Sequence, residues 1–235
     1  MISDRDLSRK NTASVADESA AGSSITAEAD RAIAVTNRLR KIYPDRRPLL
    51  EYSSPFELLI SVILSAQTTD NQVNEVTPAL FNQYPTPASL AAADRLDVEQ
   101  LVHSTGFFRN KARNIIGAAR AIHNRYGDQV PREMDDLVSI PGVGRKSANV
   151  IRGVVFGLPS IVVDTHLTRV SNRLGLATGK NPDIIERELR RIVAEEYQTD
   201  FSMGVNLHGR ARCFARKPDC SACEIREFCP SAGHV

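Results

Sequence analysis

The strongest constraint on the fold is a helical pattern that runs almost unbroken from Ala29. Apolar residues recur at spacings of three and four, which places them on one face of an amphipathic helix. Short joints containing proline or glycine separate the periodic segments. We expect helices over residues 55–67, 109–127, 133–140, 145–157 and 182–197. Only residues 160–164 resemble a strand, and this segment is too short and isolated to form a sheet. The sequence therefore predicts an all-α protein.

Composition indicates a soluble globular chain. It has 235 residues, of which 42% are apolar and 25% are charged, enough for one large or two small domains. No apolar run approaches the roughly 20 residues that span a bilayer, and no signal peptide is evident. We therefore expect a cytoplasmic protein. Residues 1–27 are rich in serine, alanine and aspartate, and we expect them to form a disordered tail outside the fold.

Positive charge is unevenly distributed along the chain. The net charge of +2 does not by itself predict a polyanionic partner. However, residues 107–125 contain five basic side chains and no acidic one: Arg109, Lys111, Arg113, Arg120 and Arg125. Residues 140–217 carry thirteen Lys or Arg against seven Asp or Glu. Such stretches suit contact with phosphates, although a solvated helix face is the better explanation of any single charge.

The segment "IPGVGRKSANV" (140–150) interrupts two helical patterns with two glycines. Gly142 and Gly144 let the backbone turn sharply where a Cβ would clash, beside the N-terminus of the next helix. Successive N–H groups can then form an anion site suited to a phosphodiester, which reads the DNA backbone rather than the bases. A tight helix–helix turn without a ligand is the alternative. Arg145, which follows immediately, favours the phosphate site.

Lys146 is the best candidate for covalent chemistry. The helix start and neighbouring Arg145 both disfavour protonation of its amine, and an unprotonated lysine is a nucleophile. The alternative is a second phosphate contact. Asp164 in "VVDTH" is well placed to cap the next helix, and its carboxylate could also stabilise positive charge or transfer protons. Spacing alone does not bring Asp164 to Lys146.

All four cysteines lie within 17 residues, at Cys213, Cys220, Cys223 and Cys229. So compact a set in an otherwise cysteine-free chain predicts one metal centre rather than disulfides. Four thiolates can bind zinc or an iron–sulfur cluster, and spacing rules leave both open. The loop between Cys213 and Cys220 displays Arg216 and Lys217, which could reach a phosphate backbone with little loss of entropy.

Six motifs in order resemble the endonuclease III family of helix-hairpin-helix DNA glycosylases with AP lyase activity. They are "LSAQTTD" (64–70), "STGFFRNKARNII" (104–116), "IPGVGRKSANV" (140–150), "VVDTH" (162–166), "LHGRARC" (207–213) and the cysteine spacing. The resemblance runs from about residue 29 to 230. It implies two all-α lobes with DNA in the cleft between them: a six-helix barrel (48–158) that contains the helix-hairpin-helix, and a cluster lobe (28–47 and 159–235).

The resemblance also assigns roles to individual residues. Lys146 matches the Schiff-base nucleophile and Asp164 the catalytic aspartate, while the four cysteines match the ligands of a 4Fe-4S cluster. Gln67 matches a residue that fills the space left by a flipped base. Phe107 occupies the position of an intercalating wedge, where the family usually has an aliphatic residue. His166 is expected among the DNA contacts. Without the resemblance, Phe107 and Gln67 are interpreted as ordinary core and helix-surface residues.

The expected function is base-excision repair of oxidised pyrimidines in damaged double-stranded DNA, by a monomer associated with a bacterial nucleoid. Two alternatives remain. A monofunctional adenine glycosylase has the same architecture and cluster, but it would call for a residue other than lysine at position 146. A non-catalytic DNA-binding protein could also be built on the same hairpin. The lesion preference is not fixed by any motif.

Overall fold

The computed structural model describes residues 26–45 and 48–234, which form two compact units. One unit is residues 48–162. The other combines residues 26–45 with the chain from Val163 onward. The tail expected over residues 1–27 lies outside the described residues except for Thr26 and Ala27, which are helical. Throughout the described part the secondary structure is helical with no strand, so the all-α prediction is confirmed.

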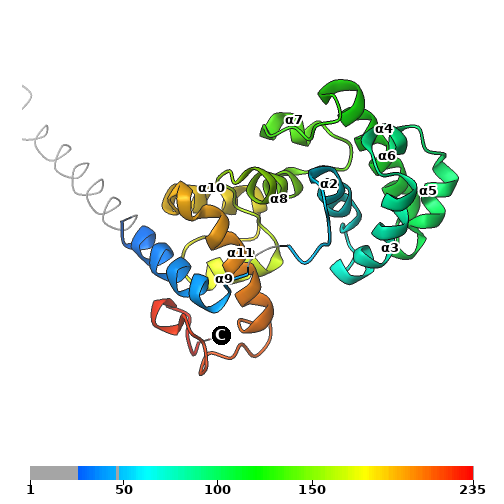
Figure 1. Cartoon of the computed structure of the whole chain (residues 1–235). Coiled ribbons are helices and arrows are strands. Elements are labelled where there is room, and N and C mark those ends of the chain that lie inside the picture. Colours follow the sequence, from blue (N-terminus) through cyan, green and yellow to red (C-terminus); the bar gives the residue numbers. More distant parts are fainter. Residues whose placement is uncertain (1–25, 46–47, 235) are drawn as a thin grey trace, which may run out of the picture. The chain divides into compact units, whose positions relative to one another are not determined.

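The unit of residues 48–162 packs around α2 and α6 (Figure 1). Its described elements are α2 (Pro55–Leu64), α3 (Asp70–Gln83), α4 (Pro87–Ala91), α5 (Arg95–Leu101), the 3₁₀ turn η1 (His103–Thr105), α6 (Phe108–Tyr126), α7 (Met134–Val138) and α8 (Arg145–Phe156). Helix α2 is buried from Phe56 to Leu64 except at Glu57, as its nearly uniform apolar sequence predicts. Helix α6 contacts α2, α4 and α5, while α8 contacts α2 and α7.

Local signals set the ends of these helices. The Ser54 side chain accepts a hydrogen bond from the Glu57 amide, and Pro55 occupies the first turn of α2 as expected. Gly127 adopts a left-handed conformation (φ 56°) and ends α6 with a bond from its N–H to the Ile122 carbonyl, as the sequence predicted.

Helix α2 ends three residues earlier than the expected range 55–67. Its last helical residue is Leu64, so Gln67 is not on a helix surface. Gln67 instead lies in the α2–α3 connection with a left-handed backbone (φ 55°). The helical period continues in the sequence through Ala66, and no glycine or proline marks this boundary.

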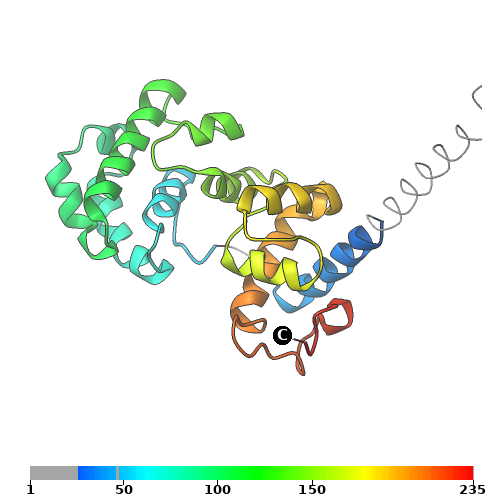
Figure 2. The ribbon, with the colours of Figure 1, turned by 180° about the vertical axis from the view of Figure 1, so that it is seen from behind.

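The second unit surrounds α9 (Thr165–Arg173) and α11 (Glu195–Ala211), which contact each other. Residues 26–42 form a helix that ion pairs join to α11 and to the C-terminal segment: Arg40 pairs with Asp200 (2.6 Å) and Arg38 with Glu227 (2.6 Å). Figure 2 shows this helix, in blue, beside the C-terminal segment, in red. The 3₁₀ turn η2 (Arg226–Phe228) belongs to that segment. The four cysteines lie there and in the loop after α11.

The single helix expected over residues 182–197 is wrong, because two helices occupy this range. Helix α10 (Pro182–Ile192) ends before Val193, whose backbone is extended (φ −94°, ψ 112°), and α11 begins at Glu195. Residues 160–164 contain no strand: Ile161 and Val163 are buried, and Asp164 leads into α9. None of the described helices has both the length and the apolar character needed to cross a membrane.

Candidate active site and metal centre

A hairpin joins α7 to α8 and requires glycine at position 142. Gly142 has a left-handed backbone (φ +82°), and an added Cβ would lie 3.0 Å from both the Asn114 Cβ and the Ile63 Cγ2 atoms. Other residues rarely adopt this conformation, and here the side chain would also clash. The prediction that a Cβ at position 142 would clash is therefore confirmed.

Gly144 differs from Gly142, and the expectation that it avoids a clash is wrong. Its backbone is extended (φ −96°, ψ 175°) and it is the N-cap of α8. No atom lies within 4 Å of where its Cβ would be. Glycine at this position therefore keeps space open beside the helix N-terminus. It also leaves the first turn of α8 without a side-chain cap.

Arg145 and Lys146 are the first two residues of α8, and both are exposed. Their position places two cations where the amide groups of a helix already present positive partial charge. An anion near this turn would meet backbone donors and basic side chains together. The hairpin geometry therefore suits a phosphate, and it presents the Lys146 amine at the surface.

Asp164 is the N-cap of α9, which confirms the structural role expected of it. Its Oδ1 atom accepts a hydrogen bond from the Leu167 amide (2.7 Å). Its Oδ2 atom accepts a hydrogen bond from the side-chain amide of Asn206 on α11. The carboxylate is half-buried and held at both oxygens. Sequence reasoning missed Asn206, because it lies 42 residues from its partner and no local pattern marks it.

His166 is half-buried on the first turn of α9. Its Nδ1 atom lies 3.2 Å from a guanidinium nitrogen of Arg169. The same guanidinium donates to the carbonyls of Gly209 (2.8 Å) and Cys213 (3.0 Å). Arg169 thus joins α9 to the end of α11 and to the loop that begins at Cys213.

Gln67 and Phe107 are both exposed and both have left-handed backbones, with φ of 55° and 48°. The Phe107 side chain is 66% exposed, so its interpretation as a core residue is wrong. It directly precedes α6 and follows Gly106, whose φ is also positive (68°). An exposed aromatic ring on a strained turn needs an explanation other than packing.

The basic stretch of residues 107–125 does not form one charged surface. Lys111 is only 4% exposed, so it is not a surface phosphate contact. Arg109 lies over the Phe108 ring, and Arg120 donates to the Ala91 carbonyl (2.8 Å). Each remaining exposed cation is therefore a separate candidate for phosphate contact.

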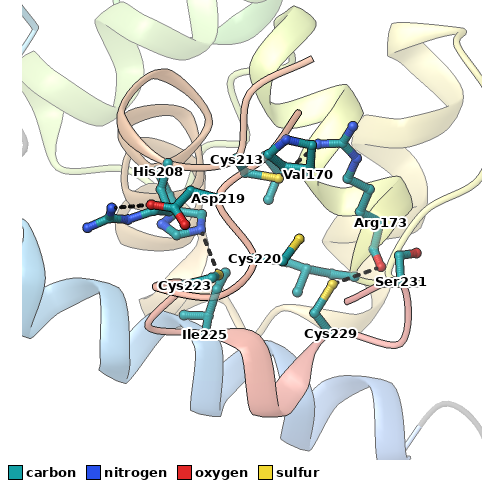
Figure 3. Close-up of a pocket in the computed structure, with 13 residues that line it drawn as sticks. Val170, Arg173, His208, Cys213, Asp219, Cys220, Cys223, Ile225, Cys229 and Ser231 are labelled. Atoms are coloured by element: carbon teal, nitrogen blue, oxygen red, sulfur yellow. Dashed lines mark hydrogen bonds and ion pairs between the residues drawn. The ribbon is translucent and has the colours of Figure 1, made fainter. Parts of the chain in front are cut away.

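The four cysteines surround one cavity in the second unit (Figure 3). All four are free thiols and half-buried, so the disulfide alternative has no support in the structure. The same cavity is lined by Val170, Arg173, Leu174, His208, Arg212, Pro218, Asp219, Ile225 and Ser231. The spacing of the cysteines therefore brings all four sulfur ligands to one place.

The chemistry of this cavity fits a cationic metal centre. Burial raises the pKa of Cys223 and Cys229, and negative charge on the neighbouring cysteines raises both further. Four thiolates so close together are unfavourable unless a metal compensates their charge. Hydrogen bonds to sulfur are also in place: Arg173 donates to Cys213 Sγ (3.2 Å), and the His208 Nε2 atom lies 3.5 Å from Cys223 Sγ.

Arg173 and His208 contact the cysteine sulfurs, and sequence reasoning did not single out either residue. Arg173 also donates to the carbonyls of Phe214 (2.7 Å) and Ala215 (3.2 Å), which fixes the loop carrying Arg216 and Lys217. Both of these basic side chains are exposed, and Lys217 has a left-handed backbone (φ 51°). His208 is fully buried, and burial lowers its pKa, which favours a neutral ring between Tyr43 and Cys223.

The hairpin, the helical scaffold and the cysteine site define a class of protein. The family model of the HhH-GPD superfamily of base excision DNA repair proteins matches residues 60–195. The model of the iron-sulfur binding domain of endonuclease III matches residues 213–229, from the first cysteine to the last. Endonuclease III of Synechocystis sp. is 48% identical over 203 residues, covering 86% of this chain and 93% of the relative. Endonuclease III of Escherichia coli is 42% identical over 195 residues, covering 83% and 92%.

Solved structures give the same assignment. A non-covalent endonuclease III–DNA complex matches with a TM-score of 0.80 and 38% identity, covering 87% of this chain and 96% of the other. A trapped endonuclease III–DNA covalent intermediate matches with a TM-score of 0.80 and 39% identity, with the same coverage. A thermostable thymine-DNA glycosylase has the same fold at 22% identity (TM-score 0.78). The chain therefore belongs to the endonuclease III family of bifunctional DNA glycosylases with AP lyase activity.

These findings confirm the resemblance seen in the sequence, the all-α helix-hairpin-helix fold and the 4Fe-4S cofactor. They also decide between the two metals that four thiolates could bind, since the matched domain is an iron–sulfur domain. The protein is a DNA-binding repair enzyme rather than a passive hairpin module.

Proposed function

We propose that Lys146 is the nucleophile with which this enzyme removes oxidised pyrimidines from DNA and then cleaves the strand. The single observation on which this depends is that Lys146 is exposed at the start of α8. This helix has no side-chain cap and directly follows a hairpin that suits a phosphate. Membership in a family of glycosylase–lyases supports covalent chemistry, and one matched structure is a trapped covalent intermediate of endonuclease III with DNA.

The proposed reaction proceeds through a covalent link between Lys146 and the sugar. The Lys146 amine attacks C1′ of the damaged nucleotide, the bond from C1′ to the base breaks, and the base leaves with the electron pair and takes up the proton that the attacking amine loses. The bond from C1′ to the ring oxygen then breaks, the second proton of the lysine nitrogen passes to that oxygen, and an imine remains between Lys146 and C1′. Loss of a proton from C2′ then expels the 3′ phosphate, which nicks the strand on the 3′ side of the abasic site. Hydrolysis of the imine releases Lys146.

Asp164 is proposed to assist these steps. A carboxylate held at a defined orientation can stabilise the cationic character that develops at the sugar and can transfer protons. Two contacts support this role, because the Leu167 amide and Asn206 fix the two oxygens of Asp164 separately. Asn206 is then a positioning residue that acts through Asp164.

Entry of the damaged base requires that its nucleotide leave the helical stack, which costs a few kcal/mol. We assign Phe107 to wedge into the duplex and Gln67 to fill the vacated space. Their exposure and left-handed backbones support this assignment. Because a weakly paired lesion costs less to expose, damaged nucleotides enter more readily than intact ones.

We assign the contacts with the DNA backbone to the hairpin and to separate basic side chains. The amides of the first turn of α8, together with the Arg145 side chain, bind one phosphate, and Arg216 and Lys217 bind another stretch of the backbone. His166 is a further proposed contact. We propose that the protein acts as a monomer on chromosomal DNA in the cytoplasm.

Cys213, Cys220, Cys223 and Cys229 are proposed to ligate the 4Fe-4S cluster. When bound, the cluster supplies the positive charge that lets four half-buried thiolates share one cavity. Arg173 fixes the conformation of the loop that carries Arg216 and Lys217 through its hydrogen bonds to the loop carbonyls. A fixed loop loses little entropy when it meets DNA.

Borohydride trapping on DNA containing an abasic site tests the proposal. The native protein is expected to form a covalent adduct, Lys146→Ala to form none, and Lys180→Ala, which removes an exposed lysine from another loop, to form as much as the native protein. On DNA carrying an oxidised pyrimidine, base release without any trappable adduct in the native protein would indicate a monofunctional glycosylase. Binding without base release or nicking would indicate a DNA-binding module.

A further inference from the structure

Lys111 is a buried lysine that the proposed chemistry does not use. It lies in the first turn of α6, is 4% exposed, and has no ion-pair partner among the described residues. Its Nζ atom donates instead to the Thr105 carbonyl (2.8 Å) and to the Thr68 hydroxyl. Burial lowers the pKa of Lys111, as expected for an ammonium without a nearby carboxylate. Burying a cation costs free energy, and in the part of the chain that the structure describes only these two hydrogen bonds offset that cost.

The two acceptors of Lys111 belong to different segments of the chain. Thr68 lies in the connection between α2 and α3, and Thr105 ends the turn η1. The Thr68 hydroxyl in turn donates to the Thr105 carbonyl (2.6 Å). The Lys111 ammonium, the Thr68 hydroxyl and the Thr105 carbonyl therefore form a closed triangle of hydrogen bonds that joins α6 to both segments.

Each of these segments carries one strained, exposed residue. Gln67 directly precedes Thr68, and Phe107 follows Thr105 after one glycine. In the described part of the chain, only four non-glycine residues have positive φ: Gln67, Phe107, Asp128 and Lys217. Two of the four thus flank the Lys111 triangle. Strained conformations persist only where surrounding contacts over-determine them, and the triangle supplies those contacts.

We infer that Lys111 is a positioning residue that locks the Gln67 and Phe107 segments together before DNA binds. This inference rests on the proposed roles of those two residues. Without the lock, both segments would have to be ordered at the moment of binding, and the lost entropy would weaken insertion into the duplex. Lys111 itself touches neither the damaged nucleotide nor Lys146 in this account. Its effect should be confined to steps in which a duplex is opened.

The test compares two DNA substrates. Lys111→Met removes the ammonium but retains a long apolar side chain, and Thr68→Val removes only the shared hydroxyl. We expect each variant to lower kcat/KM on a duplex oxidised pyrimidine by roughly tenfold to a hundredfold, as the loss of a charge-assisted hydrogen bond can do. Cleavage of an abasic site in a single strand needs no duplex opening and should change by less than about threefold. Amide hydrogen exchange should accelerate at residues 66–69 and 105–108.

Ile122→Val is the matched control, because Ile122 is fully buried on the same helix and far from both segments in sequence. It should lower stability while leaving the ratio of duplex to single-strand rates unchanged. The inference is wrong if Lys111→Met and Thr68→Val lower both rates together, as a general loss of folding would, or if they change neither the rate ratio nor the exchange. Phe107→Ala and Gln67→Ala test the underlying assignment separately: if they leave duplex activity intact, the proposed wedge and filler roles fail, whatever Lys111 does.

Discussion

Replacing each hairpin glycine by alanine separates the two reasons for glycine at this site. In Gly142→Ala, the left-handed backbone costs about 1–2 kcal/mol for any residue with a Cβ. The new methyl group would also lie 3.0 Å from Asn114 Cβ and Ile63 Cγ2. Forcing such an overpacked contact costs about 1–3 kcal/mol more. The free energy of unfolding should therefore fall by about 2–5 kcal/mol, and the melting temperature by roughly 5–20 °C.

Gly144→Ala should behave differently. Its backbone is extended and nothing lies within 4 Å of the added Cβ. Alanine is a poorer N-cap than glycine, but it also restricts the unfolded chain, so we expect stability to stay within about 1 kcal/mol of native. The methyl group would nevertheless occupy the open space beside the first turn of α8. Affinity for duplex DNA with an abasic-site analogue should fall roughly tenfold, equivalent to about 1.4 kcal/mol.

Thermal unfolding followed by circular dichroism and DNA binding followed by fluorescence anisotropy measure the two effects. Equal losses of stability in both variants would refute the conformational distinction between the glycines. Native affinity in Gly144→Ala would refute close approach of a phosphate to the start of α8. A stable Gly144→Ala protein with weakened binding is the result that supports both arguments.

Four further predictions follow from individual contacts. Asp164→Asn should keep the N-cap and change stability little, yet lower single-turnover base release by about 10²- to 10⁴-fold, whereas Asp164→Ala should also lose about 0.5–2 kcal/mol in urea unfolding. Arg173→Lys removes the guanidinium group that donates to Cys213, Phe214 and Ala215. It should therefore speed the loss of the iron–sulfur cluster in air, followed by its visible absorption, and weaken DNA binding. Phe107→Ala should leave the melting temperature nearly unchanged, because the ring is 66% exposed, but it should slow excision from duplex DNA. Burial lowers the pKa of Lys111 in the folded protein. In the unfolded chain, Lys111 keeps its proton up to its ordinary pKa near 10.5. The native protein should therefore gain stability relative to Lys111→Met as the pH rises from the lowered pKa toward that value, measured as the difference in urea unfolding.

Periodicity predicted the helices well but not where one helix stops and the next begins. The range 182–197 keeps its helical pattern across Val193 and Ala194, yet the chain is extended at Val193 and forms two helices. No proline or glycine marks this break. A tertiary requirement to redirect the chain has overridden local preference, and a pattern of residue types contains no information about that requirement.

Lys111 shows why a count of charges along the sequence does not identify which of them can contact phosphates. A helical reading of the sequence does contain the correct signal, because residues 111, 115, 118 and 122 are spaced as one face, and the last three are buried and apolar. That spacing places Lys111 on the buried side of α6. Its acceptors Thr68 and Thr105 are, however, set by tertiary contacts, as is the pairing of Asn206 with Asp164. Contacts between distant segments are the part of the site that sequence spacing did not provide.

Asp164 shows why a structural and a catalytic interpretation of one residue need not compete. A carboxylate offers about four acceptor positions, and here the Leu167 amide and Asn206 occupy one on each oxygen. The remaining lone pairs are held in fixed directions, because rotation of the carboxyl group would break both bonds. The cap is thus what orients the charge, and preorganised charge is what stabilises a cationic transition state. An aspartate that capped the helix through one oxygen alone could turn away from the sugar. The second contact, from Asn206, makes the capping geometry a condition of the catalytic role that we propose for Asp164.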